Sequence, residues 1–105
     1  ILLYCLRFTT VIRYLFTFFD NDLIAAGAMR ALKEAGYRIP EDIGIIGFDN
    51  TAMCDILEPP LTTIHVPKQA MGQLAVERLT SIIAAKPAAN VKIEIATTLV
   101  KRRSL

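Results

Sequence analysis

Two short apolar runs, each ended by a polar turn and separated by one amphipathic segment, constrain the fold of this chain most. The first run covers residues 14–19 and ends at a polar turn over residues 20–22. The second covers residues 43–48 and ends at residues 49–50. Residues 23–35 between them have the spacing of a helix with one apolar face. A strand, a helix and a strand in this order make the two strands parallel. The sequence therefore predicts an α/β fold built on a βαβ unit of a parallel sheet.

The polar turns supply the candidate binding residues. Parallel strands end at the same edge of a sheet, and open α/β sheets bind small ligands beyond the carboxyl ends of their strands. Asn21 and Asp49 are the first candidates for ligand contact, and Asp22 and Asp20 are further candidates. A carboxylate accepts two hydrogen bonds, which suits the vicinal hydroxyls of a sugar or the N–H edge of a purine. The structural alternative is helix capping, by Asn21 or Asp22 for the helix that follows and by Asp49 for a short helix over residues 51–57.

The remainder of the chain predicts a strand, a long helix and a second strand. Residues 61–66 are β-branched and predict a strand or an extended crossover. Residues 67–85 keep helical spacing after an initial proline, with an apolar stripe that indicates core or interface. Residues 91–95 alternate apolar and charged side chains, which predicts a half-buried strand that residues 97–100 extend or re-enter. The basic residues 101–103 are interpreted as a solvated terminus.

Composition narrows the class of protein. An apolar fraction of 53% in 105 residues predicts apolar surface that packs against further chain or a second subunit. A net charge of +2 does not by itself indicate nucleic-acid binding. Arg7 and Arg13 interrupt the apolar residues 1–19, and each would cost about 2.5–3.5 kcal/mol near the centre of a membrane span, so no membrane role is expected. Residues 1–13 receive no structural assignment, and because the chain starts at Ile1, we expect the natural N-terminus to lie upstream.

Nothing in the sequence predicts catalysis, a metal or a cofactor. Cys5 and Cys54 are far apart and lack a companion histidine cluster, so we expect buried or half-buried thiols in a reducing cytoplasm. His65 is a lone histidine in a β-branched segment and is interpreted as structural. Dinucleotide-binding glycine motifs, phosphate-binding loops and nucleophile elbows are all missing from the sequence. We therefore do not expect an enzyme.

The sequence resembles the C-terminal part of the effector domain in the lactose/galactose repressor (LacI/GalR) family of bacterial transcription regulators. The resemblance covers about residues 16–105. It rests on five motifs in a fixed order, namely Asn21-Asp22 and residues 24–32, 36–43, 46–50 and 60–64.

This resemblance implies an incomplete periplasmic-binding-protein-like (type I) fold, whose two lobes enclose an effector that is a sugar or a nucleobase or nucleoside. Residues 14–60 would belong to the C-terminal lobe. Residues 61–90 would cross to the N-terminal lobe and add a helix there, and residues 91–105 would hold the return strand and the basic C-terminus. Asn21 and Asp49 match family positions that contact the effector.

The resemblance also implies partners and a location. Residues 50–57 resemble part of the family's dimer interface, so a homodimer is expected. Operator DNA would be bound only by a helix-turn-helix headpiece that this chain lacks, and the protein would be cytoplasmic. Two alternatives stay open: a fragment of a periplasmic sugar-binding transport protein, and a remnant that only folds or associates. An upstream helix-turn-helix would favour the regulator, and an upstream signal peptide the transport protein.

Overall fold

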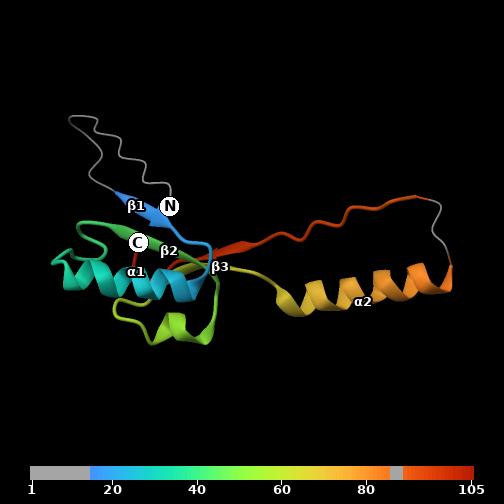
Figure 1. The fold of residues 1–105 in the computed structure, drawn as a ribbon, viewed down its shortest axis with the longest axis horizontal. Coiled ribbons are helices and arrows are strands. Elements are labelled where there is room, and N and C mark those ends of the chain that lie inside the picture. Colours follow the sequence, from blue (N-terminus) through green and yellow to red (C-terminus); the bar gives the residue numbers. More distant parts are fainter. Residues whose placement is uncertain (1–14, 86–88) are drawn as a thin grey trace.

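Helices and strands alternate along the part of the chain that the computed structural model describes, residues 15–85 and 89–105. The elements in chain order are β1 (Phe16–Phe18), α1 (Asp22–Glu34), β2 (Gly44–Asp49), the 3₁₀ helix η1 (Ala52–Asp55), β3 (Thr62–His65), α2 (Lys68–Ala84) and β4 (Thr98–Val100). Figure 1 shows their arrangement. The interpretations of residues 1–13 and of Cys5 lie outside the described residues.

The strands form one mostly parallel sheet in the order β1-β2-β3-β4. β1 runs parallel to β2, and β2 runs parallel to β3, with Ile46 opposite Thr62. β4 closes the described sheet antiparallel to β3, with Thr63 opposite Val100. The predicted parallel βαβ unit, β1–α1–β2, is therefore confirmed.

α1 forms where the sequence supplies a start, an apolar face and a stop. Asn21 lies just before the helix in extended backbone, and its Oδ1 accepts a hydrogen bond from the Ile24 N–H at 2.8 Å. The inward face of α1 buries Ala25 and Met29 against the sheet. Gly36, with φ of 88°, then takes the left-handed conformation that commonly ends a helix. The cap fixes the start of α1 at the edge of the sheet where the candidate residues lie.

The core lies on one face of the sheet, beneath α1 and η1. Ala25 and Met29 of α1 pack with Ile45 of β2, Cys54 of η1 and Leu61 before β3, all of them buried. Figure 1 shows α1 and the η1 segment on the same side of the sheet. The continuous apolar run in β2 thus corresponds to a strand at the centre of the packing.

α2 extends away from the sheet rather than packing on it (Figure 1). The described structure measures 58 × 32 × 20 Å and has a radius of gyration of 18.7 Å, against roughly 13 Å for a compact domain of 100 residues. No residue of α2 is buried, so its apolar stripe is not part of a core within the described chain. Among the described residues, no helix is both long and apolar enough to cross a bilayer.

The predicted strand over residues 91–95 is wrong. Residues 89–97 contain no strand, and Val91 and Ile93 have half or more of their surface exposed. The reason lies in β3, which ends at His65, and the partner of His65 is Thr98. Residues before Thr98 have no strand opposite them in the described sheet, so the alternating pattern has nothing to pair with. The strand forms only at β4.

Candidate functional site

The first two candidate residues follow neighbouring strands at the same edge of the sheet. Asn21 comes after β1, and Asp49 is the last residue of β2, which runs parallel to β1. Asn21 caps α1 through Oδ1, a hydrogen bond in which its amide NH₂ group takes no part. Asp20 beside it is exposed. The carboxyl ends of β1 and β2 therefore present an amide and a carboxylate at one edge.

Asp49 has an unusual backbone conformation. Its φ is 105°, and that of Asn50 is 51°, so two successive residues other than glycine lie in or near the left-handed region. The Asp49 carboxylate is 36% exposed and lies 3.9 Å from the Lys68 Nζ, which also donates to the Asp49 carbonyl oxygen. Asp49 does not cap η1, because the N-terminus of η1, at Thr51, has no side-chain capping hydrogen bond.

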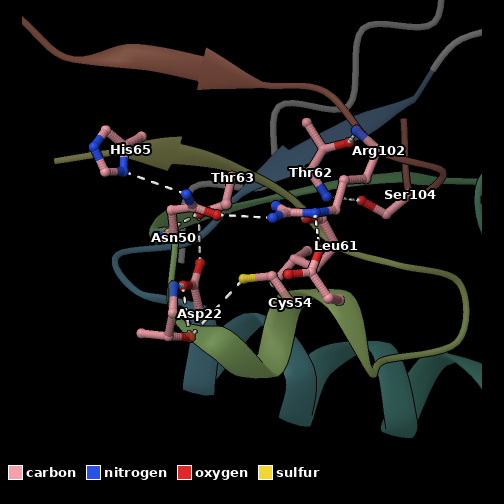
Figure 2. A network of polar contacts seen from close by, with 11 residues as sticks. Asp22, Asn50, Cys54, Leu61, Thr62, Thr63, His65, Arg102 and Ser104 are labelled. Carbon is pink, nitrogen blue, oxygen red and sulfur yellow. Dashed lines mark hydrogen bonds and ion pairs between the residues drawn. The ribbon is translucent and has the colours of Figure 1, made fainter.

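Asp22, the last residue of the first polar turn, is a buried carboxylate that is 1% exposed. Its Oδ2 accepts hydrogen bonds from the Thr51 N–H at 2.7 Å and the Thr51 hydroxyl at 2.9 Å, and its Oδ1 accepts from the Thr63 hydroxyl at 2.5 Å. Figure 2 shows these contacts between α1, the start of η1 and β3. Burial by itself raises the pKa of Asp22, but the hydrogen bonds from Thr51, Thr63 and Cys54 outweigh it and hold the pKa below its usual value. Asp22 thus links α1 to the start of η1 and to β3, and we call this buried carboxylate the brace beneath the site.

Asn50 connects the Asp49 turn to two other parts of the chain. Its N–H donates to the Thr63 hydroxyl at 3.3 Å, and its amide nitrogen lies 3.3 Å from the His65 Nδ1. Its Oδ1 accepts a hydrogen bond from the Arg102 Nη2 at 2.9 Å. His65 itself is exposed, and Asn50 is the residue that its ring contacts in this network.

The interpretation of the basic end as a solvated terminus is wrong for Arg102. Lys101 and Arg103 are exposed, but the Arg102 side chain is only 15% exposed. Its Nε donates to the Asp55 carboxylate at 2.7 Å and its Nη1 to the Leu61 carbonyl oxygen at 3.0 Å, beside the bond to Asn50. The physical reason is the pairing of β4 with β3, which places Arg102, two residues after β4, beside Leu61 and Asn50 (Figure 2).

Four polar residues of the site carried little or no signal in the sequence: Thr51, Thr63, Arg102 and Ser104. Apart from Cys54, which is three residues from Thr51, their side-chain partners lie between 13 and 59 residues away along the chain. Only the grouping of β-branched residues near Thr63 marked a strand there, and that pattern does not reveal a hydroxyl directed at Asp22. Contacts of this range depend on sheet order rather than local spacing.

The site offers hydrogen-bonding groups rather than reactive ones. In residues 15–85 and 89–105, no group of three or more His, Cys, Asp and Glu side chains converges as a metal site would require. Burial raises the pKa of the Cys54 thiol, and its hydrogen bond with Asp22 adds to the shift, so this thiol is less reactive than an exposed one. The groups at this edge, an amide and a carboxylate, can donate and accept hydrogen bonds.

A parallel βαβ unit whose strand ends share one edge is a feature of the periplasmic-binding-protein-like fold. The family model of the periplasmic binding protein-like domain matches residues 17–105. The HTH-type transcriptional repressor PurR of Mannheimia succiniciproducens is 45% identical over 85 residues, which are 81% of this chain and 25% of PurR.

Solved structures of transcription regulators have the same fold. The regulator CelR in complex with cellobiose aligns with a TM-score of 0.78 and 29% identity, over 89% of this chain and 28% of CelR. The lac repressor dimer bound to operator and the anti-inducer ONPF aligns with a TM-score of 0.77 and 35% identity, over 85% and 31%. This chain belongs to the periplasmic binding protein-like family, in the form found in the effector domain of LacI-type regulators. It spans about a quarter of the length of the PurR repressors that it matches.

Proposed function

We propose that this chain is the effector-sensing part of a LacI-type transcriptional repressor, and that Asn21 and Asp49 contact the effector. The observation that carries the proposal is the state of Asp49. Its carboxylate lies at a strand end, is 36% exposed, and is not used to cap η1. The capping alternative for Asp49 therefore has no support, because the N-terminus of η1 has no side-chain capping hydrogen bond.

The two further candidates rank below these. Asp22 is buried and accepts three hydrogen bonds inside the chain, so it supports the turn rather than a ligand. Asp20 is exposed at the rim, which is compatible with a peripheral contact. Asn21 retains two N–H donors after capping α1, and a donor pair beside an acceptor carboxylate suits a polyol or a heterocycle with both kinds of edge.

The effector class in this proposal is a sugar or a nucleobase or nucleoside. CelR is described with cellobiose, a related LacI-family regulator from Enterococcus faecium with ribose, and the closely similar PurR sequences are described as repressors. Binding would close two lobes, and only a difference in effector affinity between the open and closed states can drive that change. The fully assembled protein would be a cytoplasmic homodimer that binds operator DNA through a separate headpiece and carries out no catalysis.

We also propose the division of the chain between the lobes. Residues 14–60 would form part of the C-terminal lobe, residues 61–90 the crossover and a helix of the N-terminal lobe, and residues 91–105 the return. The elongated shape supports this division, since α2 has no buried residue and stands apart from the sheet. The transport-protein alternative has less support, because the relatives at 40–45% identity are described as repressors.

The test is a calorimetric titration of the intact gene product with a panel of sugars, including cellobiose and ribose, and of purine bases and nucleosides. Asp49→Ala should weaken binding of the best ligand by about tenfold or more, since a hydrogen bond to a charged group contributes on the order of 1.5–3 kcal/mol. Glu34→Ala is the matched control, because it removes an exposed carboxylate from the far end of α1. Binding by Asp49→Ala that equals the original protein, or a panel without any ligand, would count against the proposal.

A further inference from the structure

The turn that carries Asp49 is held by contacts outside its own strand. Asp49 and Asn50, with φ of 105° and 51°, occupy backbone conformations that side chains other than glycine rarely adopt. Such conformations persist when the surrounding structure determines them, and they are concentrated at ligand sites and switches. The question is which contact restrains the turn.

Three side chains contact Asn50, and they differ in charge and in their place along the chain. Thr63 and His65 both belong to β3, the strand next to Asp49 in the sheet. Arg102 is 52 residues further along the chain and is the charged one of the three partners. Only 15% of its side chain is exposed, so its contact with Asn50 is shielded from solvent. A charged donor strengthens the hydrogen bond to the Asn50 Oδ1.

Contacts other than the one with Asn50 also hold Arg102 in place. Its backbone N–H donates to the Thr62 hydroxyl at 2.9 Å, and the Leu61 carbonyl oxygen and the Asp55 carboxylate accept from the guanidinium. The planar guanidinium bonds Asp55, Leu61 and Asn50 at the same time, and Figure 2 shows its contacts with Leu61 and Asn50. A lysine could supply the charge but not the fork. The contacts with Asp55 and Leu61 therefore orient the guanidinium toward the Asn50 Oδ1.

We infer that Arg102 is a positioning residue that holds the Asp49–Asn50 turn, and with it the Asp49 carboxylate, in the conformation that contacts the ligand. Arg102 follows β4, where the chain rejoins the sheet after its excursion through α2. A displacement of the returning chain would therefore move the partner of Asn50. This links the lobe crossover to the ligand turn, and the link to ligand binding rests on the proposed function.

Amide hydrogen exchange in the intact gene product tests the positioning role without any ligand. Arg102→Leu should accelerate exchange of the Asn50 N–H at least tenfold, and Arg102→Lys should accelerate it less. Arg103→Leu, which removes an exposed guanidinium from the next residue, should leave it unchanged. The Met29 N–H in the core reports global opening and should exchange at its original rate. Unchanged exchange at Asn50, or equal acceleration at Asn50 and Met29, would overturn the inference.

A second variant keeps the test valid if Arg102→Leu does not fold. Asn50→Gly removes the same contact at a position whose φ of 51° glycine adopts without strain, and it leaves the Arg102 bonds to Leu61 and Asp55 in place. Relative to its intrinsic rate, the amide of residue 50 should again exchange at least tenfold faster, whereas Asn50→Asp, which keeps an acceptor for Arg102, should exchange at close to the original rate. Equal exchange in the Gly and Asp variants would contradict the role of Arg102.

Calorimetry with cellobiose and ribose separates the inference from the proposed function. Arg102→Leu should weaken whichever sugar binds by at least fivefold, and Arg103→Leu should not. Faster exchange at Asn50 with unchanged affinity would overturn the link between the turn and the ligand. If neither sugar binds the original protein, sugar sensing fails for these two compounds, and the exchange result alone decides whether Arg102 holds the turn.

Discussion

Ser104 and Ile45 are joined by two hydrogen bonds in opposite directions. The Ser104 hydroxyl donates to the Ile45 carbonyl oxygen at 2.7 Å, and the Ile45 N–H donates to the Ser104 carbonyl oxygen at 2.7 Å. The same hydroxyl accepts from the Thr62 N–H at 2.7 Å. It therefore bridges Thr62, the first β3 residue in the ladder, to Ile45, which lies one residue before the ladder begins on β2. A side chain near the C-terminus completes the pairing of the two central strands.

Ser104→Ala should destabilise the protein by about 1–3 kcal/mol, because it leaves the buried Ile45 carbonyl oxygen and Thr62 N–H without a partner. Urea unfolding followed by circular dichroism measures the change. Ser81→Ala is the control, since Ser81 is exposed on α2 and its substitution should alter the unfolding free energy by less than about 0.5 kcal/mol. Equal stability of the two variants would show that water replaces the hydroxyl.

The local parts of this structure were predictable from the sequence because their signals are local. The cap at Asn21, the apolar face of α1 and the stop at Gly36 lie within 16 residues, and each acts on its neighbours. The continuous apolar run of β2 marked a strand covered by other elements. From these, parallel pairing and the shared edge of Asn21 and Asp49 followed by geometry alone.

The support of the site was not predictable in this way. Arg102 resembles a solvated residue in a basic tail, and only the pairing of β4 with β3 brings it to Asn50. Asp22 resembles one of three caps for α1, but it bonds Thr51, which is 29 residues away. The alternating pattern of residues 91–95 predicted a strand, but no strand forms there, because no strand of the described sheet lies opposite these residues. Sequence periodicity reports what a segment can do, and the sheet order decides whether a partner is present.

Gly47→Ala should destabilise the protein by about 1–3 kcal/mol. A Cβ at this position would lie 2.5 Å from the Asp22 Oδ1 and 3.0 Å from the Leu61 Cδ2. Asp22 cannot move aside cheaply, because Thr51 and Thr63 hold its carboxylate with three hydrogen bonds. Thermal unfolding by calorimetry measures the loss, and an unchanged melting temperature would show that the carboxylate is mobile.

The matched substitution Gly27→Ala should have the opposite sign. Gly27 lies inside α1, and a Cβ there meets nothing within 4 Å. Alanine loses less backbone entropy than glycine in a helix, so the variant should be more stable by up to about 1 kcal/mol. The same calorimetric measurement applies. A destabilised Gly27→Ala would indicate that this exposed position packs against another surface in the assembled protein.

Acid should weaken the fold through Asp22. Folding lowers the pKa of this carboxyl from 3.8, so the unfolded chain takes up the proton first as the pH falls. The stabilisation is fully present above the unfolded value of 3.8 and is lost as the pH falls through the lowered value in the folded state. Asp22→Asn, which offers one acceptor oxygen to three donors, should be destabilised at pH 7 by about 1.5–3 kcal/mol.

The exposed Asp42 carboxyl, which also has a lowered pKa, serves as a comparison for the acid dependence caused by Asp22. The Arg38 side chain beside Asp42 lowers the pKa of that carboxyl to about 2, and because the pair is exposed its contribution is small. Urea unfolding between pH 7 and pH 2 should show a shallower acid loss in Asp22→Asn than in the original protein. Asp42→Asn should change the slope less. The reverse order would mean that the exposed pair, not the buried brace, controls acid stability.

The isolated 105-residue chain should associate through α2. Val76, Leu79 and Ile83 are between 57% and 76% exposed, and none of the residues of α2 is buried. Exposed apolar patches of this kind drive association. Sedimentation velocity across a dilution series should therefore detect dimers or larger species, and a combined Val76→Glu, Leu79→Glu and Ile83→Glu variant should shift them toward monomer. Gln73→Glu adds charge to the same helix without removing apolar surface and should not. A monodisperse monomer at every concentration of the original chain would refute association through this helix.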